Sequence, residues 1–395
     1  MNGFCHALSP WKAHLAATAA LLALAWVAPG AARAADPDLQ RPAKLALTPL
    51  GNLLVAEAMS AEAPQNTGRV SIVAPNGKRR TLIDGLPSSP SSLGNEATGP
   101  SGLYLAGRTL YVVIGLGDPT VPGPLPRTEV PNPDGPASPI FSSVLAVHFS
   151  AAAERFTTGV TLTLADHFKL KDGKRLVRAD SAGRRITIEL IVDFPDYLPE
   201  PLPILETNVR HSQPYGVVAD DDFLYVVDGG YNRVFKVEIA TGEFDTLVAY
   251  PDTPNPLFGI IGPRVIENVP TSIRWDGDHL LVSILGGFPF PAGQSQIRVV
   301  DPDTGEDSQL IGGLTSAVDV LPLQENGVTV AYLTLEYSLS FLTGGPGRLQ
   351  LFTPFGDIVL DDELPGAGSM VYDRKSNSVI VASINTGELT LIPLP

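Results

Sequence analysis

Short aliphatic runs recur along the chain at intervals of about fifty residues, separated by turns rich in glycine, proline, asparagine and aspartate. In each unit, one run opens behind a proline, any residue and a small residue. A second run begins eight residues after that small residue, and a third run follows. The clearest openings are Pro100-Ser101-Gly102, Pro214-Tyr215-Gly216 and Pro270-Thr271-Ser272. A fixed period made only of strands predicts an all-β propeller built from four-stranded antiparallel blades.

The spacing of the second strands indicates six blades and leaves seven open as an alternative. These strands are expected to begin at Leu53, Leu110, Leu224, Leu280, Tyr332 and Val379. The interval from Leu110 to Leu224 is about twice the others. Residues 118–139 hold eight prolines, which cannot form a regular ladder, so we expect a loop there. Residues 161–193 lack the proline opening, and we expect an extra hairpin with residues 171–174 at its tip. We therefore favour an inserted loop and hairpin at about 118–205 over a seventh blade.

The last unit ends after its third strand, at Pro395. The stretch near residues 39–41 is predicted to supply the missing outer strand of this blade. Such a closure would pair the two ends of the propeller and leave no open edge.

The first 34 residues fit a signal peptide. Lys12 precedes an apolar run at 15–28, and Ala32-Arg33-Ala34 matches a small-x-small cleavage site, with a retained anchor as the alternative. We expect cleavage after Ala34, a single propeller domain over 35–395, and a bacterial protein that is periplasmic or secreted. Cys5, the chain's one cysteine, would leave with this segment, which excludes disulfides from the mature protein.

The chain carries a net charge of −15, which becomes −17 without Lys12 and Arg33. So acidic a surface repels phosphate backbones and anionic lipid, and we expect no nucleic-acid partner. We also expect no stable membrane span after cleavage, and a monomer.

Several motifs resemble the ScyD/ScyE family, which is related to six-bladed propellers of the NHL type. They lie in order over nearly the whole mature chain and include Gly51-Asn-Leu-Leu-Val-Ala-Glu57, Val226-Val-Asp-Gly-Gly-Tyr-Asn-Arg233 and Gly287-Phe-Pro-Phe-Pro-Ala-Gly293. The resemblance implies a six-bladed propeller and implies little about chemistry. It is consistent with an accessory factor in secondary metabolism outside the cytoplasm. The insertion at 118–205 departs from the family's usual pattern.

Loop lengths favour one face of the propeller as the functional one. The connections from second to third strands are long, and they share a face with the starts of the innermost strands. The mouth of the central channel on that face is therefore the expected site for a small molecule or a protein partner. The candidate ligand-binding residues are Tyr215, Thr271, Phe288, Phe290 and Asp319.

The fifth position of each second strand is expected to point to the same rim. Carboxylates occupy it in alternate blades, as Glu57, Asp228 and Glu336, and three such oxygens suit Ca²⁺ or another divalent cation. That arrangement resembles lactonase-type propellers, so a metal-dependent hydrolase is an alternative function. In the other interpretation, each carboxylate caps backbone amides or pairs with the arginine of the next strand.

His211, which lies just before the opening at Pro214, is a candidate for a general base. The chain has no Gly-x-Ser-x-Gly elbow, His-Glu-x-x-His motif or phosphate loop, so catalysis has no further support in the sequence. An envelope protein-interaction scaffold that uses the same loops is the third hypothesis.

Overall fold

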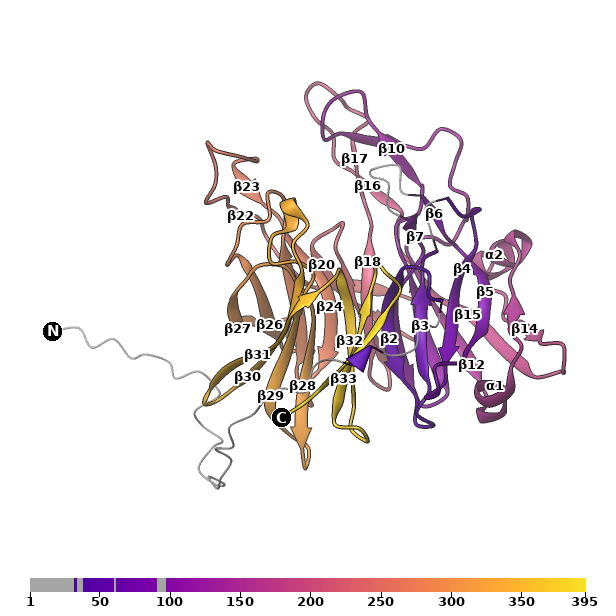
Figure 1. The fold of residues 1–395 in the computed structure, drawn as a ribbon. Helices are drawn as coiled ribbons and strands as arrows, with labels where there is room; N and C mark the ends of the chain where they lie inside the picture. Colours follow the sequence, from indigo (N-terminus) through magenta and orange to yellow (C-terminus); the bar gives the residue numbers. More distant parts are fainter. Residues whose placement is uncertain (1–31, 34–37, 60–61, 91–96) are drawn as a thin grey trace.

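Six antiparallel sheets surround one axis as the blades of a β-propeller (Figure 1). The computed structural model describes residues 32–33, 38–59, 62–90 and 97–395. The innermost strands of blades 1 to 6 are β2 (Pro42–Leu47), β8 (Pro100–Ala106), β18 (Pro214–Ala219), β24 (Asn268–Trp275), β28 (Ala317–Glu325) and β32 (Ala367–Asp373). Each of them contacts the next, and β32 contacts β2, so the ring closes. The six-bladed prediction is confirmed, and the seven-bladed alternative is wrong.

The remaining strands follow in antiparallel order from the axis outward. The second strands are β3 (Leu53–Glu57), β9 (Thr109–Ile114), β19 (Phe223–Asp228), β25 (Leu280–Gly286), β29 (Val328–Glu336) and β33 (Ser378–Ser383). The third strands are β4 (Gly68–Val73), β12 (Ser143–Phe149), β20 (Arg233–Glu238), β26 (Ser295–Val300), β30 (Gly347–Thr353) and β34 (Leu389–Pro393). The fourth strands are β5 (Arg79–Leu86), β15 (Arg185–Asp193), β21 (Phe244–Ala249), β27 (Asp307–Leu314), β31 (Gly356–Leu364) and β1 (Ala32–Arg33).

The hydrophobic core is divided among the seams between neighbouring blades. Six clusters of buried side chains lie there, one at each seam of the ring. A blade is therefore covered on both faces, which explains why its second strand is aliphatic throughout rather than alternating. In β3, for example, all five residues are buried.

The N-terminal part of the chain completes blade 6, as predicted, but with other residues than expected. The outer strand is β1, which pairs antiparallel with β34, and residues 39–41 do not form it. Leu39 instead packs in the core between blades 6 and 1, and the backbone N–H of Gln40 donates to Glu57. Cleavage after Ala34 would remove β1. The rest of the predicted signal segment lies outside the described residues.

Blade 2 carries the insertion. Beyond β15 it gains a fifth strand, β14 (Leu176–Ala179), and two short helices, α1 (Ala151–Phe156) and α2 (Leu164–Lys171), which the sequence did not predict. The extra hairpin exists, but its turn lies at 180–184, because residues 171–174 end α2 instead. A further strand, β13 (Val160–Thr161), pairs with the outer strand of blade 1. Together these elements cover the outer side of blades 1 and 2.

One face of the propeller carries short ribbons on its connections, at the top of Figure 1. They are β6 (Ser89–Pro90) with β7 (Ala97–Thr98), β10 (Thr120–Pro122) with β11 (Glu129–Pro131), β16 (Tyr197–Pro199) with β17 (Val209–His211), and β22 (Thr253–Pro254) with β23 (Val265–Ile266). The proline-rich segment 118–139 is thus not entirely irregular, since it holds β10 and β11. Among the described residues, no helix has the length and apolar character needed to cross a membrane.

Candidate binding surface

The innermost strand of every blade has a β-bulge at the same place, so six bulges surround the propeller axis. Pairing between the first and second strands shifts by one residue just after the first strand begins. The bulged residues are Ala43, Ser101, Tyr215, Thr271, Val318 and Gly368. Two of their hydroxyls tie neighbouring blades together. Ser101 donates to the carbonyl of Pro214 at 2.8 Å, and Thr271 donates to that of Ala317 at 3.0 Å.

Tyr215 and Thr271, two of the predicted ligand-binding residues, therefore belong to this ring of bulges. Tyr215 is half-buried, and its hydroxyl accepts a hydrogen bond from Gln213 at 3.2 Å. The Thr271 hydroxyl also lies 3.2 Å from the carbonyl of Ser283. Since both of its contacts are backbone carbonyls, the hydroxyl of Thr271 is occupied within the scaffold.

In blades 1, 4 and 5, the residue that follows the bulge belongs to a buried charge cluster made by Lys44, Ser272 and Asp319. Asp319, with no exposed surface, lies 3.0 Å from the Lys44 ammonium. It also accepts hydrogen bonds from the guanidinium of Arg274 at 2.7 and 3.1 Å and from the hydroxyl of Ser272 at 2.6 Å. The backbone N–H of Met370 adds another at 3.1 Å. The carboxylate is thus shared among blades 1, 4, 5 and 6.

The environment of this cluster shifts the pKa of both partners. Burial alone would raise the pKa of the Asp319 carboxyl, but the charges of Arg274 and Lys44 hold it well below its usual range. Burial lowers the pKa of Lys44 to about 8, although the negative charge of Asp319 acts to raise it. Asp319, predicted to bind ligand, is therefore placed where it joins blades across the axis.

The three carboxylates predicted to hold a metal are each buried and each bound to neighbours in their own blade. Glu57 accepts from Arg69 at 2.8 and 2.9 Å and from the hydroxyl of Ser71. Glu336 accepts from Arg348 at 2.7 Å. Within the described ranges, the structure brings no three His, Cys, Asp or Glu side chains into a group able to hold a metal ion. The capping and pairing interpretation accounts for these contacts.

Asp228 differs from the two glutamates in its partners. Its carboxylate accepts from the hydroxyl of Ser212 at 2.6 Å and from the backbone N–H groups of Gln213 and Tyr231 at 3.0 and 2.8 Å. Burial raises the pKa of the Asp228 carboxyl, which these hydrogen bonds oppose. Arg233, the expected partner, lies over the ring of Tyr231 instead. Asp228 therefore caps the turn between β19 and β20.

His211 lies on the ribboned face, in β17. Its Nδ1 is 2.8 Å from the carboxylate of Glu129 in β11, which joins the ribbon of blade 2 to the connection that enters blade 3. Both side chains are one-fifth exposed. A carboxylate at Nδ1 fixes the orientation of the imidazole, an arrangement that suits general acid–base chemistry at Nε2.

Phe288 and Phe290 lie at the centre of a larger aromatic group on the same face. Phe290 stacks on Phe341 with ring centroids 4.0 Å apart, and Phe288 meets Phe290 edge to face at 6.3 Å. Tyr337 lies 5.3 Å from Phe341. The stack joins the long loop of blade 4 to that of blade 5, where Phe341 begins the 3₁₀ helix η2 (Phe341–Thr343).

A third loop, residues 255–263, extends this group. Its Gly262 has positive φ and lies so close to Pro289 that an added Cβ would be 2.7 Å from the proline ring. The amide of Asn255 holds the loop by donating to the carbonyls of Ile261 and Pro263 at 3.0 and 2.7 Å. The loop that enters blade 4, the long loop of blade 4 and the long loop of blade 5 are therefore in contact with one another in sequence.

We call this the aromatic loop surface, defined by Phe258, Ile260, Phe288, Phe290, Phe341 and Leu342. Four of these side chains are strongly exposed: Ile260 at 85%, Phe258 at 53%, Leu342 at 52% and Phe288 at 41%. Its three loops, 255–263, 286–294 and 337–346, contain no charged residue. Arginines flank it, with Arg127 over Phe288 at 5.6 Å and Arg264 over Phe258 at 5.2 Å. A group of exposed apolar side chains in neighbouring loops is typical of binding surfaces.

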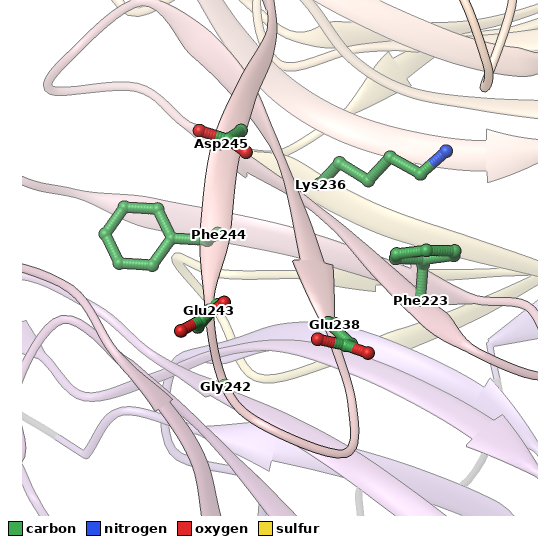
Figure 2. A pocket seen from close by; sticks show the side chains of 7 residues that line it. All are labelled: Phe223, Lys236, Glu238, Gly242, Glu243, Phe244 and Asp245. Atoms are coloured by element: carbon green, nitrogen blue, oxygen red, sulfur yellow. The ribbon is translucent and has the colours of Figure 1, made fainter.

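Two grooves lie elsewhere on the blades. The larger has a volume of about 580 Å³ and lies along the outer hairpin of blade 3, where Phe223, Lys236 and Phe244 contribute side chains (Figure 2). Lys236 is engaged there, since its ammonium lies over the Phe223 ring at 4.5 Å and donates to the carbonyl of Pro302 at 3.0 Å. The other groove, of about 380 Å³, lies between the fourth strand of blade 4 and the end of the third strand of blade 5.

No family model and no curated protein matches the chain. Similar solved structures include streptogramin B lyase, at 12% identity over 92% of this chain and 97% of that one, with a TM-score of 0.42. A protein of unknown function from Bacteroides thetaiotaomicron aligns at 10% identity over 92% and 72%, with a TM-score of 0.45. A chain of a nidogen/laminin complex aligns at 11% over 84% and 92%, with a TM-score of 0.35. Similarity at this level assigns no function, and membership of the ScyD/ScyE family stays a prediction.

The sequence indicates part of the aromatic loop surface and misses the rest. Phe288 and Phe290 stand out because prolines flank them, whereas Phe258, Ile260, Phe341 and Leu342 do not. The signal that could have found them is the absence of charge from three long loops in a chain whose net charge is −15.

Proposed function

We propose that this protein binds an uncharged, flat and largely apolar small molecule on the aromatic loop surface. The observation that carries the proposal is the Phe290–Phe341 stack, flanked by exposed Phe288 and Leu342 in loops without charge. Aromatic faces favour planar ligands. The three loops contribute no charged side chain, and the charges beside them are the guanidinium groups of Arg127 and Arg264, which lie over aromatic rings. The rigid propeller supplies the fixed scaffold that such loops need.

The resemblance to ScyD/ScyE proteins supports a role beside secondary metabolism outside the cytoplasm, in which the protein holds a product or an intermediate. The predicted signal peptide supports the same location. In this proposal the protein binds without transforming its ligand.

Fluorescence titration with the neutral aromatic probe N-phenylnaphthylamine tests the proposal. Saturable binding is expected, and both Phe290→Ala and Phe341→Ala should weaken it by about tenfold, or about 1.4 kcal/mol. Phe355→Ala is the matched control, because Phe355 is 91% exposed on another part of blade 5. Equal weakening by all three substitutions, or no saturable binding, would show that this surface is not the site.

A second function, hydrolysis or elimination with His211 as the general base, has one observation in its favour, the Glu129 carboxylate at its Nδ1. A chromogenic lactone and ester panel tests it. Turnover that falls in His211→Gln and in Glu129→Gln would support this function, whereas turnover that both variants retain would exclude it.

A further inference from the structure

Helix α2 buries two polar side chains together with Leu170 and leaves two large apolar side chains in solvent. It buries Asp166 and His167, whereas Leu164 and Phe168, one turn apart, are 46% and 55% exposed. His167 is anchored by contacts with the hydroxyl of Ser138 at 3.0 Å and the carbonyl of Gly85 at 2.8 Å. Because these contacts fix the helix orientation, the apolar pair is held in solvent.

The surroundings of that pair add more apolar surface and positive charge. Phe156 at the end of α1 is 63% exposed, and Val177 in β14 is 51% exposed. Lys174 and Arg175, in the segment between α2 and β14, are each 63% exposed. Both have an acidic neighbour, since Lys174 lies 3.9 Å from Asp172 and Arg175 lies 3.2 Å from Glu189. Lys171 pairs with Asp193. Of the local acids, Asp166 and Asp180 are buried, whereas Asp172 and Glu189 are 66% and 34% exposed, so the positive charge of this surface is partly offset. We call this surface the basic rim, made of Phe156, Leu164, Phe168, Lys171, Lys174, Arg175 and Val177.

The outer edge of blade 5 has the opposite charge and a similar apolar content. Its fourth strand, β31, pairs only with β30, so its other side is a sheet edge. Phe355 in the preceding turn is 91% exposed, and Ile358 and Val359 in the strand are 48% and 47% exposed. Four acids lie in the same strand, and none of the ion pairs among the described residues involves them. We call this surface the acidic rim, made of Phe355, Asp357, Ile358, Val359, Asp361, Asp362 and Glu363.

These two rims lie on opposite sides of the molecule. In a closed ring of six blades, blade 5 is diametrically opposite blade 2. Figure 1 shows this, with α1, α2 and β14 at the right and β30 and β31 at the left. The outer strands of blades 3 and 4, β21 and β27, contribute none of the strongly exposed large hydrophobic side chains.

We propose that the basic rim of one molecule docks on the acidic rim of a second copy. The argument is charge complementarity combined with exposed apolar side chains on both surfaces. Because the two surfaces differ and lie opposite each other, the contact is heterologous and repeats, so it builds a linear chain of propellers rather than a closed dimer. This departs from the monomer expected from the sequence, and it is independent of the ligand proposed above.

Two molecules that each carry a net charge of −15 repel each other, but this repulsion is weaker than the number suggests. At physiological ionic strength the Debye length is about 8 Å, so charges on the remainder of each molecule are largely screened. The two rims meet at contact distance, where screening is weaker. The charges of the two rims therefore determine whether two copies associate, and a change in the sign of one rim should prevent association.

Sedimentation velocity of the purified chain at physiological ionic strength, over a series of concentrations, tests the proposal. The sedimentation coefficient of the unmodified protein should rise with concentration. One double variant, Lys174→Glu with Arg175→Glu, makes both rims acidic, and the other, Asp361→Lys with Asp362→Lys, makes both basic. Each variant alone should lose the rise. An equimolar mixture should regain it, because every acidic rim then meets a basic one.

A concentration-independent monomer of the unmodified protein would overturn the proposal, as would a mixture that stays monomeric while circular dichroism shows both variants folded. Vesicles of phosphatidylglycerol and phosphatidylcholine form the second arm. Vesicle binding that the Lys174/Arg175 variant loses, without self-association of the unmodified protein, would assign the basic rim to a lipid surface and likewise refute docking between copies.

Discussion

The ammonium of Lys44 and the carboxylate of Asp319 lie 3.0 Å apart on the propeller axis, although they belong to blades 1 and 5. Contacts between blades mainly join neighbours in the ring, whereas this pair connects blades that are not adjacent. Arg274 of blade 4 shares the same carboxylate at 2.7 Å. Two cations thus depend on one buried anion.

Replacing that anion should be costly. Asp319→Asn leaves Lys44 and Arg274 without a counter-charge, so we expect the free energy of unfolding to fall by about 3 kcal/mol or more. Denaturant titration followed by circular dichroism measures it. Asp362→Asn, at an exposed position of β31, is the control and should change the stability by less than about 0.5 kcal/mol. Equal stability of both variants would contradict a structural role for the axial cluster.

Stability should rise with pH above the pKa of Lys44. That pKa is about 8 in the folded protein, against 10.5 for an unperturbed lysine. Between these values the unfolded chain binds more protons, so the free energy of unfolding increases with pH. Below a pH of about 8, burial of the charged ammonium is a constant cost.

The variant Lys44→Met isolates this contribution. It removes the titrating group and leaves Asp319 paired with Arg274. The free energy of unfolding of the unmodified protein should rise relative to that of the variant by on the order of 2 kcal/mol between pH 7 and pH 10. Taking the difference cancels the titration of tyrosines and other groups. A difference that does not depend on pH would show that Lys44 titrates as an ordinary lysine.

Calcium and chelators should leave the melting temperature unchanged. Glu57, Asp228 and Glu336 are occupied by arginine, hydroxyl and backbone partners, so a bound cation would have to displace them. Thermal unfolding with millimolar Ca²⁺ and with a chelator measures this, because an ion that binds only the folded state stabilises it by mass action. A rise in melting temperature that Glu336→Gln abolishes would restore the metal hypothesis.

The strands were predictable from the sequence because every blade repeats the same local pattern. The proline opening even marks the bulge, since the pairing shifts at the middle residue of Pro100-Ser101-Gly102 and of Pro270-Thr271-Ser272. Helix α2 was not predictable from its apolar residues, because it buries Asp166 and His167 and exposes Leu164 and Phe168.

The sequence left two interpretations of the three carboxylates open, a metal site or capping and pairing, and the strand register is consistent with the second. Glu57 lies opposite Arg69 across its strand pair, and Glu336 lies opposite Arg348, so ion pairs form. Asp228 is also opposite Arg233, but the shorter turn between them offers backbone N–H groups that the carboxylate accepts from instead. The Lys44–Asp319 contact has no local signal at all, because it connects strands from distant parts of the chain.

The axial cluster has a mechanical consequence for a ring that the two ends of its chain close. Strand β1 pairs with β34 at only two positions, and cleavage after Ala34 would remove it, so this pairing contributes little to the closure of blade 6. Lys44 lies near the start of blade 1 and is tethered to blades 4 and 5 through Ser272 and Asp319. A force that pulls on the first residues of blade 1 is therefore resisted by the contacts of Lys44 with blades 4 and 5, as well as by packing against blade 6.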